Sequence, residues 1–286
     1  MRKTELSNRL QTVVNMLDAK SKRVSVGKTI GTAFTGTMED EGYCVADIGC
    51  DHGFVSIYLF EHKIASRVIA MDVNQGPLQF AREHVKEAGL EAYIDVRLSD
   101  GFSSLQKGEA NAAVIAGMGG RLMVRLLEEG KEKIALMQEL VLQPQSEVSL
   151  LRQYIRNAGY RLVEEEMVLE EGKFYTILHV YIQPDKSGTS KTLMSSQQTA
   201  LPQTLQPLPQ PALPLPQTVL DKYGEDLIAK KHPVLVEYVA YRLERHEKIL
   251  ASYPENGDEV KRKELITIVD ELKAIIAYWE GIYNEM

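Results

Sequence analysis

The chain has 286 residues, of which 44% are hydrophobic and 26% charged, a composition typical of globular proteins that excludes a disordered or fibrous one. Its formal net charge is −7, and its two cysteines, Cys44 and Cys50, exclude a disulfide scaffold and favour a reduced, cytoplasmic protein. We find no apolar run of about 18 residues and no apolar core in the first ten, so we expect neither a membrane span nor a secretion signal.

Charge is unevenly distributed along the chain. Residues 1–28 contain seven basic and two acidic side chains, although the whole chain is acidic. A local basic patch can bind phosphate groups on an acidic protein. A solvated helix face explains the same charges equally well, so charge alone does not decide between the two.

The predicted elements alternate between strands and helices after an N-terminal helix at 5–18, whose leucines and Val13 recur at helical spacing. A polar insertion follows at 20–42. Strands are expected at 43–48, 67–72, 93–98, 112–116 and 140–143, with helices at 54–61, 77–88, around 122–127 and at 148–158. Two last strands, at 162–169 and 174–181, are expected to pair antiparallel. This pattern predicts an α/β, doubly wound, Rossmann-like sheet with a terminal antiparallel hairpin.

The composition changes at Pro184. Seven of the eleven prolines lie in residues 184–218, which predicts a linker rich in Pro and Gln. A ligand for an SH3-like partner is the alternative interpretation of this stretch. Beyond it, apolar residues at three- and four-residue steps predict a helical hairpin resembling a coiled coil. We therefore expect a first domain at 1–183, the linker, and a helical domain at 219–286.

The most informative motif is Asp47-Ile48-Gly49-Cys50-Asp51-His52-Gly53, at the end of the first predicted strand. Its glycines allow the backbone to approach a ligand closely. Asp51 stands where a dinucleotide-binding motif has its middle glycine, and two carboxylates at this turn would repel a pyrophosphate. They suit a ligand with a cationic centre, which favours S-adenosylmethionine over NAD.

Two further acids end the next two predicted strands. Asp72, followed by Val73, could accept hydrogen bonds from both ribose hydroxyls of such a cofactor. Asp100, followed by Gly101, could accept one from its adenine amino group. Because the carboxyl ends of parallel strands lie at one edge of the sheet, the acids are expected to surround one ligand. Three unrelated loop acids are the alternative.

The fourth and fifth predicted strands end in segments suited to a flat acceptor. Gly117-Met118-Gly119-Gly120 would let a base lie against the backbone beside the transferable methyl group, or it is simply a tight turn. Gln143-Pro144-Gln145 offers side-chain amides that can hydrogen-bond a base edge.

Together these motifs resemble the bacterial tRNA adenine-22 N1-methyltransferases, the TrmK family. The resemblance spans roughly residues 5–182, and the combination of D-I-G-x-D-H with A-G-M-G-G is its most specific part. It rests on Leu6-Ser7-Asn8-Arg9-Leu10, Ala46-Asp47-Ile48-Gly49, Asp51-His52, Gly76-Pro77, Asp100-Gly101, Ala116-Gly117-Met118-Gly119-Gly120 and Leu142-Gln143-Pro144. Gln145 stands where the family commonly has asparagine.

The resemblance implies a class I methyltransferase fold, S-adenosylmethionine as cofactor, tRNA as substrate and a helical C-terminal domain that helps to bind the tRNA. The residues expected at the cofactor are Asp47, Gly49, Asp51, His52, Gly53, Asp72, Val73, Asp100, Gly101 and Gly117. Those expected at the reacting base are Gly117, Met118, Gly119, Gly120, Gln143 and Pro144, and those expected on RNA are Arg9, Lys20, Lys22 and Arg23.

Other functions remain open at this point. The same motifs fit a methyltransferase that acts on another RNA, a protein or a small molecule. They also fit a non-catalytic RNA-binding protein with a degenerate cofactor fold. We expect no metal site, because Cys44, Cys50 and His52 have no second ligand pair at a matching spacing. We also expect a monomer.

Overall fold

The computed structural model describes residues 4–17, 42–182, 213–254 and 257–281. The chain divides into two compact units, residues 1–186 and 187–286. Nearly all of the expected insertion at 20–42 and most of the expected linker at 184–218 lie outside the described residues, as do Lys20, Lys22 and Arg23.

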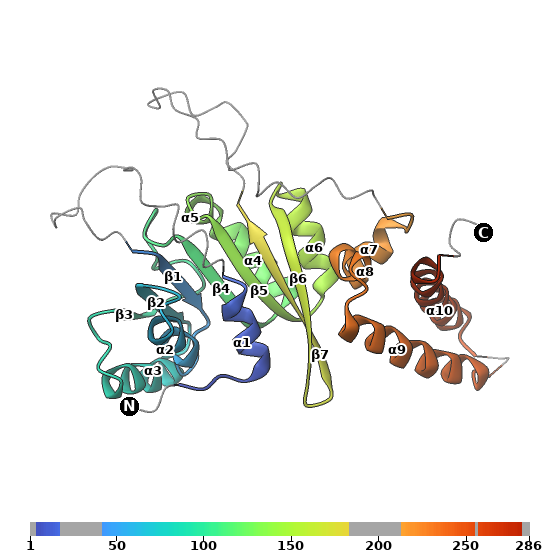
Figure 1. The fold of residues 1–286 in the computed structure, drawn as a ribbon, viewed down its shortest axis with the longest axis horizontal. Coiled ribbons are helices and arrows are strands. Elements are labelled where there is room, and N and C mark those ends of the chain that lie inside the picture. The colour runs from blue at the N-terminus through green and yellow to red at the C-terminus, as the bar shows by residue number, and fades with distance from the viewer. Residues whose placement is uncertain (1–3, 18–41, 183–212, 255–256, 282–286) are drawn as a thin grey trace, which may run out of the picture. The chain divides into compact units, whose positions relative to one another are not determined.

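The first unit is built on a seven-stranded sheet in the order β3-β2-β1-β4-β5-β7-β6 (Figure 1). The first five strands are parallel, and β7 pairs antiparallel with both β5 and β6. The strands are β1 (Cys44–Ile48), β2 (Arg67–Asp72), β3 (Ile94–Leu98), β4 (Ala112–Gly119), β5 (Glu139–Ser146), β6 (Arg161–Glu170) and β7 (Lys173–Tyr181). This arrangement confirms the predicted doubly wound sheet with its terminal hairpin.

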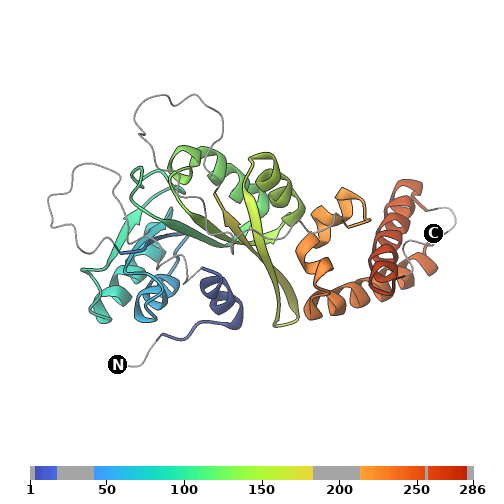
Figure 2. The same cartoon turned by 45° about the horizontal axis from the view of Figure 1, so that its top comes forward.

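Helices cover both faces of this sheet because buried strand residues alternate between two apolar clusters. Val45 and Val68 belong to the cluster that includes α1–α3, whereas Ala46 and Ile69 belong to the one that includes α4–α6. The helices are α1 (Asn8–Asn15), α2 (Phe54–Glu61), α3 (Gln75–Glu87), α4 (Gly120–Glu129), α5 (Lys131–Ile134) and α6 (Val148–Asn157). In both views α1 lies between α2 and the β6–β7 hairpin (Figures 1 and 2).

Several predicted boundaries agree with the structure, and two differ in an informative way. Helix α2 and strand β2 have the predicted bounds. Strand β4, however, continues beyond Ala116 to Gly119, and β5 continues beyond Gln143 to Ser146, because the two strands keep pairing through an irregular register. Gly117 and Gly119 therefore belong to a distorted strand end and not to a turn.

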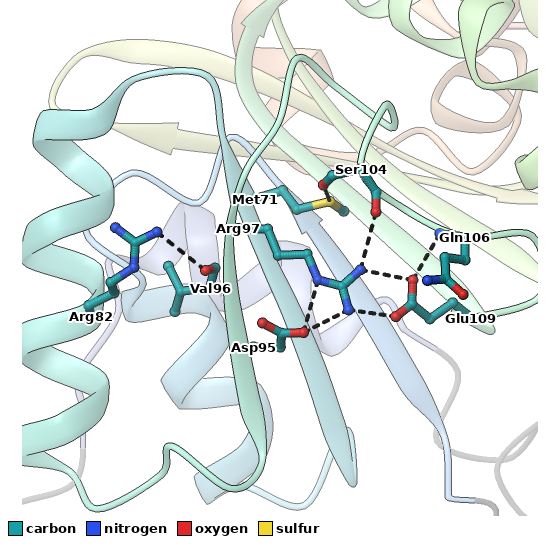
Figure 3. Close-up of polar contacts among 8 residues, drawn as sticks. All are labelled: Met71, Arg82, Asp95, Val96, Arg97, Ser104, Gln106 and Glu109. Carbon is teal, nitrogen blue, oxygen red and sulfur yellow. Dashed lines mark hydrogen bonds and ion pairs between the residues drawn. The ribbon is translucent and has the colours of Figure 1, made fainter. Parts of the chain in front are cut away.

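A polar network holds the chain between β3 and β4 (Figure 3). Arg97 on β3 donates to Asp95, to both carboxylate oxygens of Glu109 and to the carbonyl of Ser104. Its hydrogen bonds to Glu109 hold the pKa of that carboxyl below its usual range. The segment after Asp100 is thereby tied to the sheet at several points.

The second unit consists of helices in its described part. They are α7 (Gln217–Tyr223), α8 (Glu225–Ala229), α9 (Pro233–Ala251) and α10 (Glu259–Trp279). Helices α9 and α10 pack together and correspond to the expected hairpin, with Val239 and Leu272 fully buried. The short helices α7 and α8 lie before it, and α8 is tied to the end of α10 by Trp279 Nε1, which donates to the carbonyl of Ile228 at 2.9 Å.

Candidate cofactor and substrate site

Asp47 is buried near the carboxyl end of β1, with 4% of its surface exposed. Its Oδ2 accepts a hydrogen bond of 2.6 Å from Ser56 Oγ on α2. Burial raises the pKa of Asp47 to about 6, with a contribution from the negative charge of Asp72. Positive charge placed beside this carboxyl group would favour its ionised form, so the site suits a cationic ligand.

The turn after β1 contains three residues with positive φ. Gly49, Asp51 and Gly53 have φ of +77°, +50° and +77°, a region that glycine enters without strain. The Gly49 and Cys50 N–H groups both donate to the Met71 carbonyl, so the turn is fixed to the end of β2. The Asp51 side chain is 69% exposed and that of His52 is 42% exposed, so both remain available to a ligand.

Asp72 lies beside this turn at the end of β2. It is 8% exposed, and its two carboxylate oxygens accept from the Asp51 and Asn74 backbone N–H groups at 3.2 and 2.8 Å. Val73 follows it and is 59% exposed. The structure therefore brings Asp47, Asp51 and Asp72 together, as the motif predicts for acids at neighbouring strand ends.

Asp100 lies at the next position along the same edge, after β3. The Ser99 N–H donates to the Asp72 carbonyl, which places the two strand ends side by side. The Asp100 side chain is 55% exposed and forms an ion pair of 3.3 Å with Arg125 on α4. Gly101 has φ of +54° and is buried against Leu126. Asp100 is thus the most accessible of the three strand-end acids.

The Gly117–Gly120 segment faces the turn across the edge of the sheet. A side chain at Gly49 would collide with the terminal methyl group of Met118, so the Met118 thioether lies over the Gly49 backbone. A side chain at Gly120 would come within 2.5 Å of the Glu147 carbonyl oxygen, which fixes the start of α4 against the end of β5. The two expected binding segments therefore adjoin one another.

The two glutamines at the end of β5 have different environments. Gln143 is fully buried, and its Oε1 accepts from the Gly117 N–H at 3.1 Å, while its Nε2 donates to the Pro144 carbonyl. Pro144 is buried as well. Gln145 is exposed, and its Nε2 lies close to Gly117. Gln145 is consequently the amide of this pair that faces solvent beside the glycine segment.

Arg9 on α1 contacts Gln143 at the end of β5, although the two residues are more than 130 positions apart in the sequence. Its guanidinium donates to Gln143 Oε1, pairs with Glu170 at 3.5 Å and lies 5.1 Å from the centre of the Tyr175 ring. The side chain is only 17% exposed. The charge of Arg9, which we expected to contact RNA, is thus already neutralised within the unit.

Sequence reasoning missed three contributors to this site. Ser56 holds the Asp47 carboxylate, and Glu170 and Tyr175 hold Arg9. Ser56 is fully buried on a helix that is otherwise rich in apolar residues, and that contrast is the signal that could have revealed it. Glu170 and Tyr175 carry no local signal, because their partner lies more than 160 residues away in the chain.

Within the described residues, no three His, Cys, Asp or Glu side chains are grouped so that they could hold a metal ion. None of the helices in those parts of the chain has the length and apolar character needed to span a membrane. Both cysteines are buried as free thiols, and burial raises the pKa of Cys44 to about 11.

Comparison with known proteins gives one family and several close folds. A family described as "Methyltransferase domain" matches residues 34–178, which is about half of the chain. A tRNA (adenine(22)-N(1))-methyltransferase of Bacillus subtilis is 39% identical over 137 residues, which cover 48% of this chain and 58% of that protein. The sequence match thus spans little more than half of that relative.

Two solved structures resemble the chain over nearly its whole length. The crystal structure of the B. subtilis m1A22 tRNA methyltransferase TrmK has a TM-score of 0.70 at 27% identity, covering 96% of this chain and 100% of that one. Streptococcus pneumoniae Sp1610, a suggested tRNA (m1A22) methyltransferase solved in complex with S-adenosyl-L-methionine, has a TM-score of 0.67 at 26% identity. It covers 95% of this chain and 99% of that one.

Proposed function

The chain belongs to the methyltransferase domain family, and from this premise we propose that it transfers the methyl group of S-adenosylmethionine to N1 of adenine 22 in tRNA. The proposal takes its acceptor from the B. subtilis tRNA (adenine(22)-N(1))-methyltransferase and its cofactor from the S. pneumoniae complex. The strand-end acids and the glycine segment of this chain fit both.

The observation that carries the proposal is the row of carboxylates at one edge of the sheet. Asp47, Asp72 and Asp100 lie at or just beyond the ends of three neighbouring parallel strands, and burial, with a smaller contribution from the charge of Asp72, raises the pKa of Asp47. A site built to bind pyrophosphate would place positive charge and free N–H groups here instead. The arrangement supports a positively charged ligand with hydroxyl and amino groups, which is the chemistry of S-adenosylmethionine.

In the proposed roles, Asp47 and Asp51 face the charged end of the cofactor, Asp72 accepts from ribose and Asp100 accepts from its adenine. When bound, S-adenosylmethionine supplies a methyl group that its positively charged sulfur makes electrophilic. Adenine N1 already carries an in-plane lone pair, so the chain does not need to provide a strong base. Its main contribution is to hold N1 in line with the methyl group at reacting distance.

The acceptor base is proposed to lie against the Gly117–Gly120 segment. This segment has no side chain at Gly117 or Gly119, and the exposed amide of Gln145 lies beside it, which suits the edge of a flat base. N1 of adenine normally faces a pairing partner, so the base must turn out of the tRNA to reach the site.

Incubation with an unmodified tRNA transcript and methyl-labelled cofactor tests the proposal. We expect label at N1 of adenine 22, detected as a reverse-transcription stop, and none in a transcript with guanine at that position. The Asp72→Ala variant should lose both labelling and calorimetric cofactor binding. Methylation at another position, or cofactor binding without methylation of any tRNA, would contradict the proposed acceptor.

We also propose that the enzyme acts as a monomer in the cytoplasm. The tRNA substrate and the two free thiols support the compartment. Light scattering during gel filtration measures the mass directly, and a mass of about 32 kDa is expected for a monomer.

A further inference from the structure

We propose that an aromatic cluster formed by His52, Phe54, Phe80 and His84 stacks on an unpaired nucleobase of the tRNA substrate. This inference rests on the proposed function and adds an RNA-binding subsite to it. Three members of this cluster, Phe54, Phe80 and His84, are not among the residues assigned above to the cofactor or to the reacting base.

The rings of the cluster adjoin one another on the surface of the first unit. The Phe54 and His84 ring centres are 4.7 Å apart with planes inclined by 24°, and the His52 and Phe80 ring centres are 5.2 Å apart. His52 also stacks with Phe54 at 6.2 Å and 27°. Phe54 is thus nearly parallel to its two histidine neighbours, whereas the Phe80 ring is tilted by 44° against His52.

The two phenylalanines of the cluster are exposed although they are apolar. Phe54 is 45% and Phe80 is 50% exposed. Burial of the Phe80 ring would favour folding. Helix α3 instead packs on the core through residues such as the fully buried Ala81, and the Phe80 side chain remains outside that contact. Exposed aromatic faces of this kind are used to stack bases of single-stranded nucleic acids.

The backbone is arranged so that the rings meet. Gly53 packs on α3 so closely that a Cβ at this position would lie 3.1 Å from the Ala81 Cβ, and its φ is +77°. His84 Nδ1 donates to the His52 carbonyl at 2.9 Å, which ties the turn to α3. The beginning of α2 and the middle of α3 are thus held together, each contributing aromatic rings.

The position of the cluster indicates a nucleobase as the occupant. His52 belongs to the turn that carries Asp51 and Gly53, so the rings continue directly from the proposed cofactor site. A base that stacks here would belong to the same tRNA whose adenine is held at Gly117–Gly120. Stacking does not require a particular base, because every base offers a flat face.

The test compares Phe80→Leu with Phe80→Tyr in the full-length protein. Leucine keeps an apolar side chain but removes the flat ring, so we expect KM for the tRNA transcript to rise about 5- to 100-fold. Tyrosine keeps the ring and should restore the KM to near the unaltered value. Calorimetric affinity for S-adenosylmethionine should stay the same in both variants, because Phe80 does not belong to the strand-end site.

Tyr93 provides a matched control on the same unit. It is 48% exposed and stacks with Phe60 at 4.4 Å. Because it directly precedes β3, it lies at the amino ends of the parallel strands, whereas the proposed cofactor site lies at their carboxyl ends. Tyr93→Leu should leave the KM for tRNA unchanged. Circular dichroism of all variants reports whether each is folded.

The outcomes separate this inference from the proposed function. If the unaltered protein methylates adenine 22 and Phe80→Leu has the same KM, the stacking subsite is wrong while the function stands. If Phe80→Leu and Tyr93→Leu raise the KM equally, the effect is not specific to the cluster, and the inference is again wrong. If the unaltered protein methylates no tRNA, the function and the subsite are both overturned.

Discussion

The guanidinium of Arg9 and the amide of Gln143 are joined by a hydrogen bond that links helix α1 to the end of strand β5. The acceptor is the same amide oxygen that receives the N–H of the glycine segment on β4. Arg9 thus contributes to the position of that segment without being exposed itself.

Arg9→Ala should therefore lower kcat for tRNA methylation while leaving cofactor affinity nearly unchanged. Loss of a hydrogen bond from a charged group costs about 1.5–3 kcal/mol, which corresponds to roughly 10- to 100-fold in rate. Arg9→Lys, which keeps the charge, should recover part of the loss. Gln11→Ala on the same helix removes only a hydrogen bond to Tyr58 and serves as the control. An unchanged kcat, with only the KM for tRNA raised, would favour the phosphate contact expected from the sequence.

Gly49→Ala should weaken cofactor binding, because the new methyl group would displace Met118 from its place over the turn. Gly108→Ala is the matched control, since Gly108 has φ of +75° but open space around it. Both substitutions impose a similar backbone cost of about 1–2 kcal/mol, measurable by denaturation. Only Gly49→Ala should change calorimetric affinity, and adding Met118→Ala should restore part of it. Equal affinities of the two glycine variants would contradict this role for Gly49.

Asp47 should make the stability of the unliganded protein depend on pH. Burial raises the pKa of Asp47 from its usual value of 3.8 to about 6 in the folded state, so the folded state favours the protonated form. The stabilising effect of that proton is fully present below about pH 4 and is lost as pH rises through 6. Asp47→Asn should therefore increase the free energy of unfolding at pH 8 by up to about 3 kcal/mol, and by little at pH 4. Urea denaturation at both pH values measures this difference, and equal effects at the two would refute it.

The Arg97 network should contribute to stability through ion pairs that are largely shielded from water. Arg97 is 20% and Glu109 16% exposed, so Arg97→Gln should destabilise the protein by about 2–4 kcal/mol at pH 7. Because the pKa of Glu109 is lowered, its contribution is present above its unfolded pKa and is lost as pH falls through the folded pKa. The variant should thus lose less stability on acidification than the unaltered protein does. Arg125→Gln, which removes an exposed ion pair, should change stability by less than about 1 kcal/mol.

A chain ending at residue 183 should bind S-adenosylmethionine but bind tRNA more weakly. The first unit contains the whole sheet and all of the proposed cofactor residues, so it holds what cofactor binding needs. Calorimetry and filter binding measure the two ligands separately. Methylation of tRNA by the shortened chain at the full rate would exclude the helical unit from substrate binding.

The sequence was most informative where structure depends on neighbouring residues. Asp47, Asp72 and Asp100 could be placed because each lies at or just beyond the end of a short apolar strand, and parallel strands bring their carboxyl ends together. The bounds of α2 and β2 followed in the same way from their periodicity and flanking turn residues.

Features that depend on distant pairing could not be predicted. The Gly117–Gly120 segment has the composition of a turn, and a proline such as Pro144 is rare inside a central strand. Pairing between β4 and β5 nevertheless extends both strands through an irregular register. Helices α7 and α8 are seven and five residues long, too short to show a periodic pattern. Arg9 gives no sign in the sequence that its partner is Glu170.

That last contact also fixes an order of events during protein synthesis. Helix α1 is translated more than 150 residues before the hairpin that holds Arg9. Domains generally fold as units once their segments have emerged, and the contact between Arg9 and Glu170 can form only after the hairpin has been translated. A nascent chain stalled before residue 170 would therefore carry the cofactor-binding strands while Arg9 lacks its pairing with Glu170.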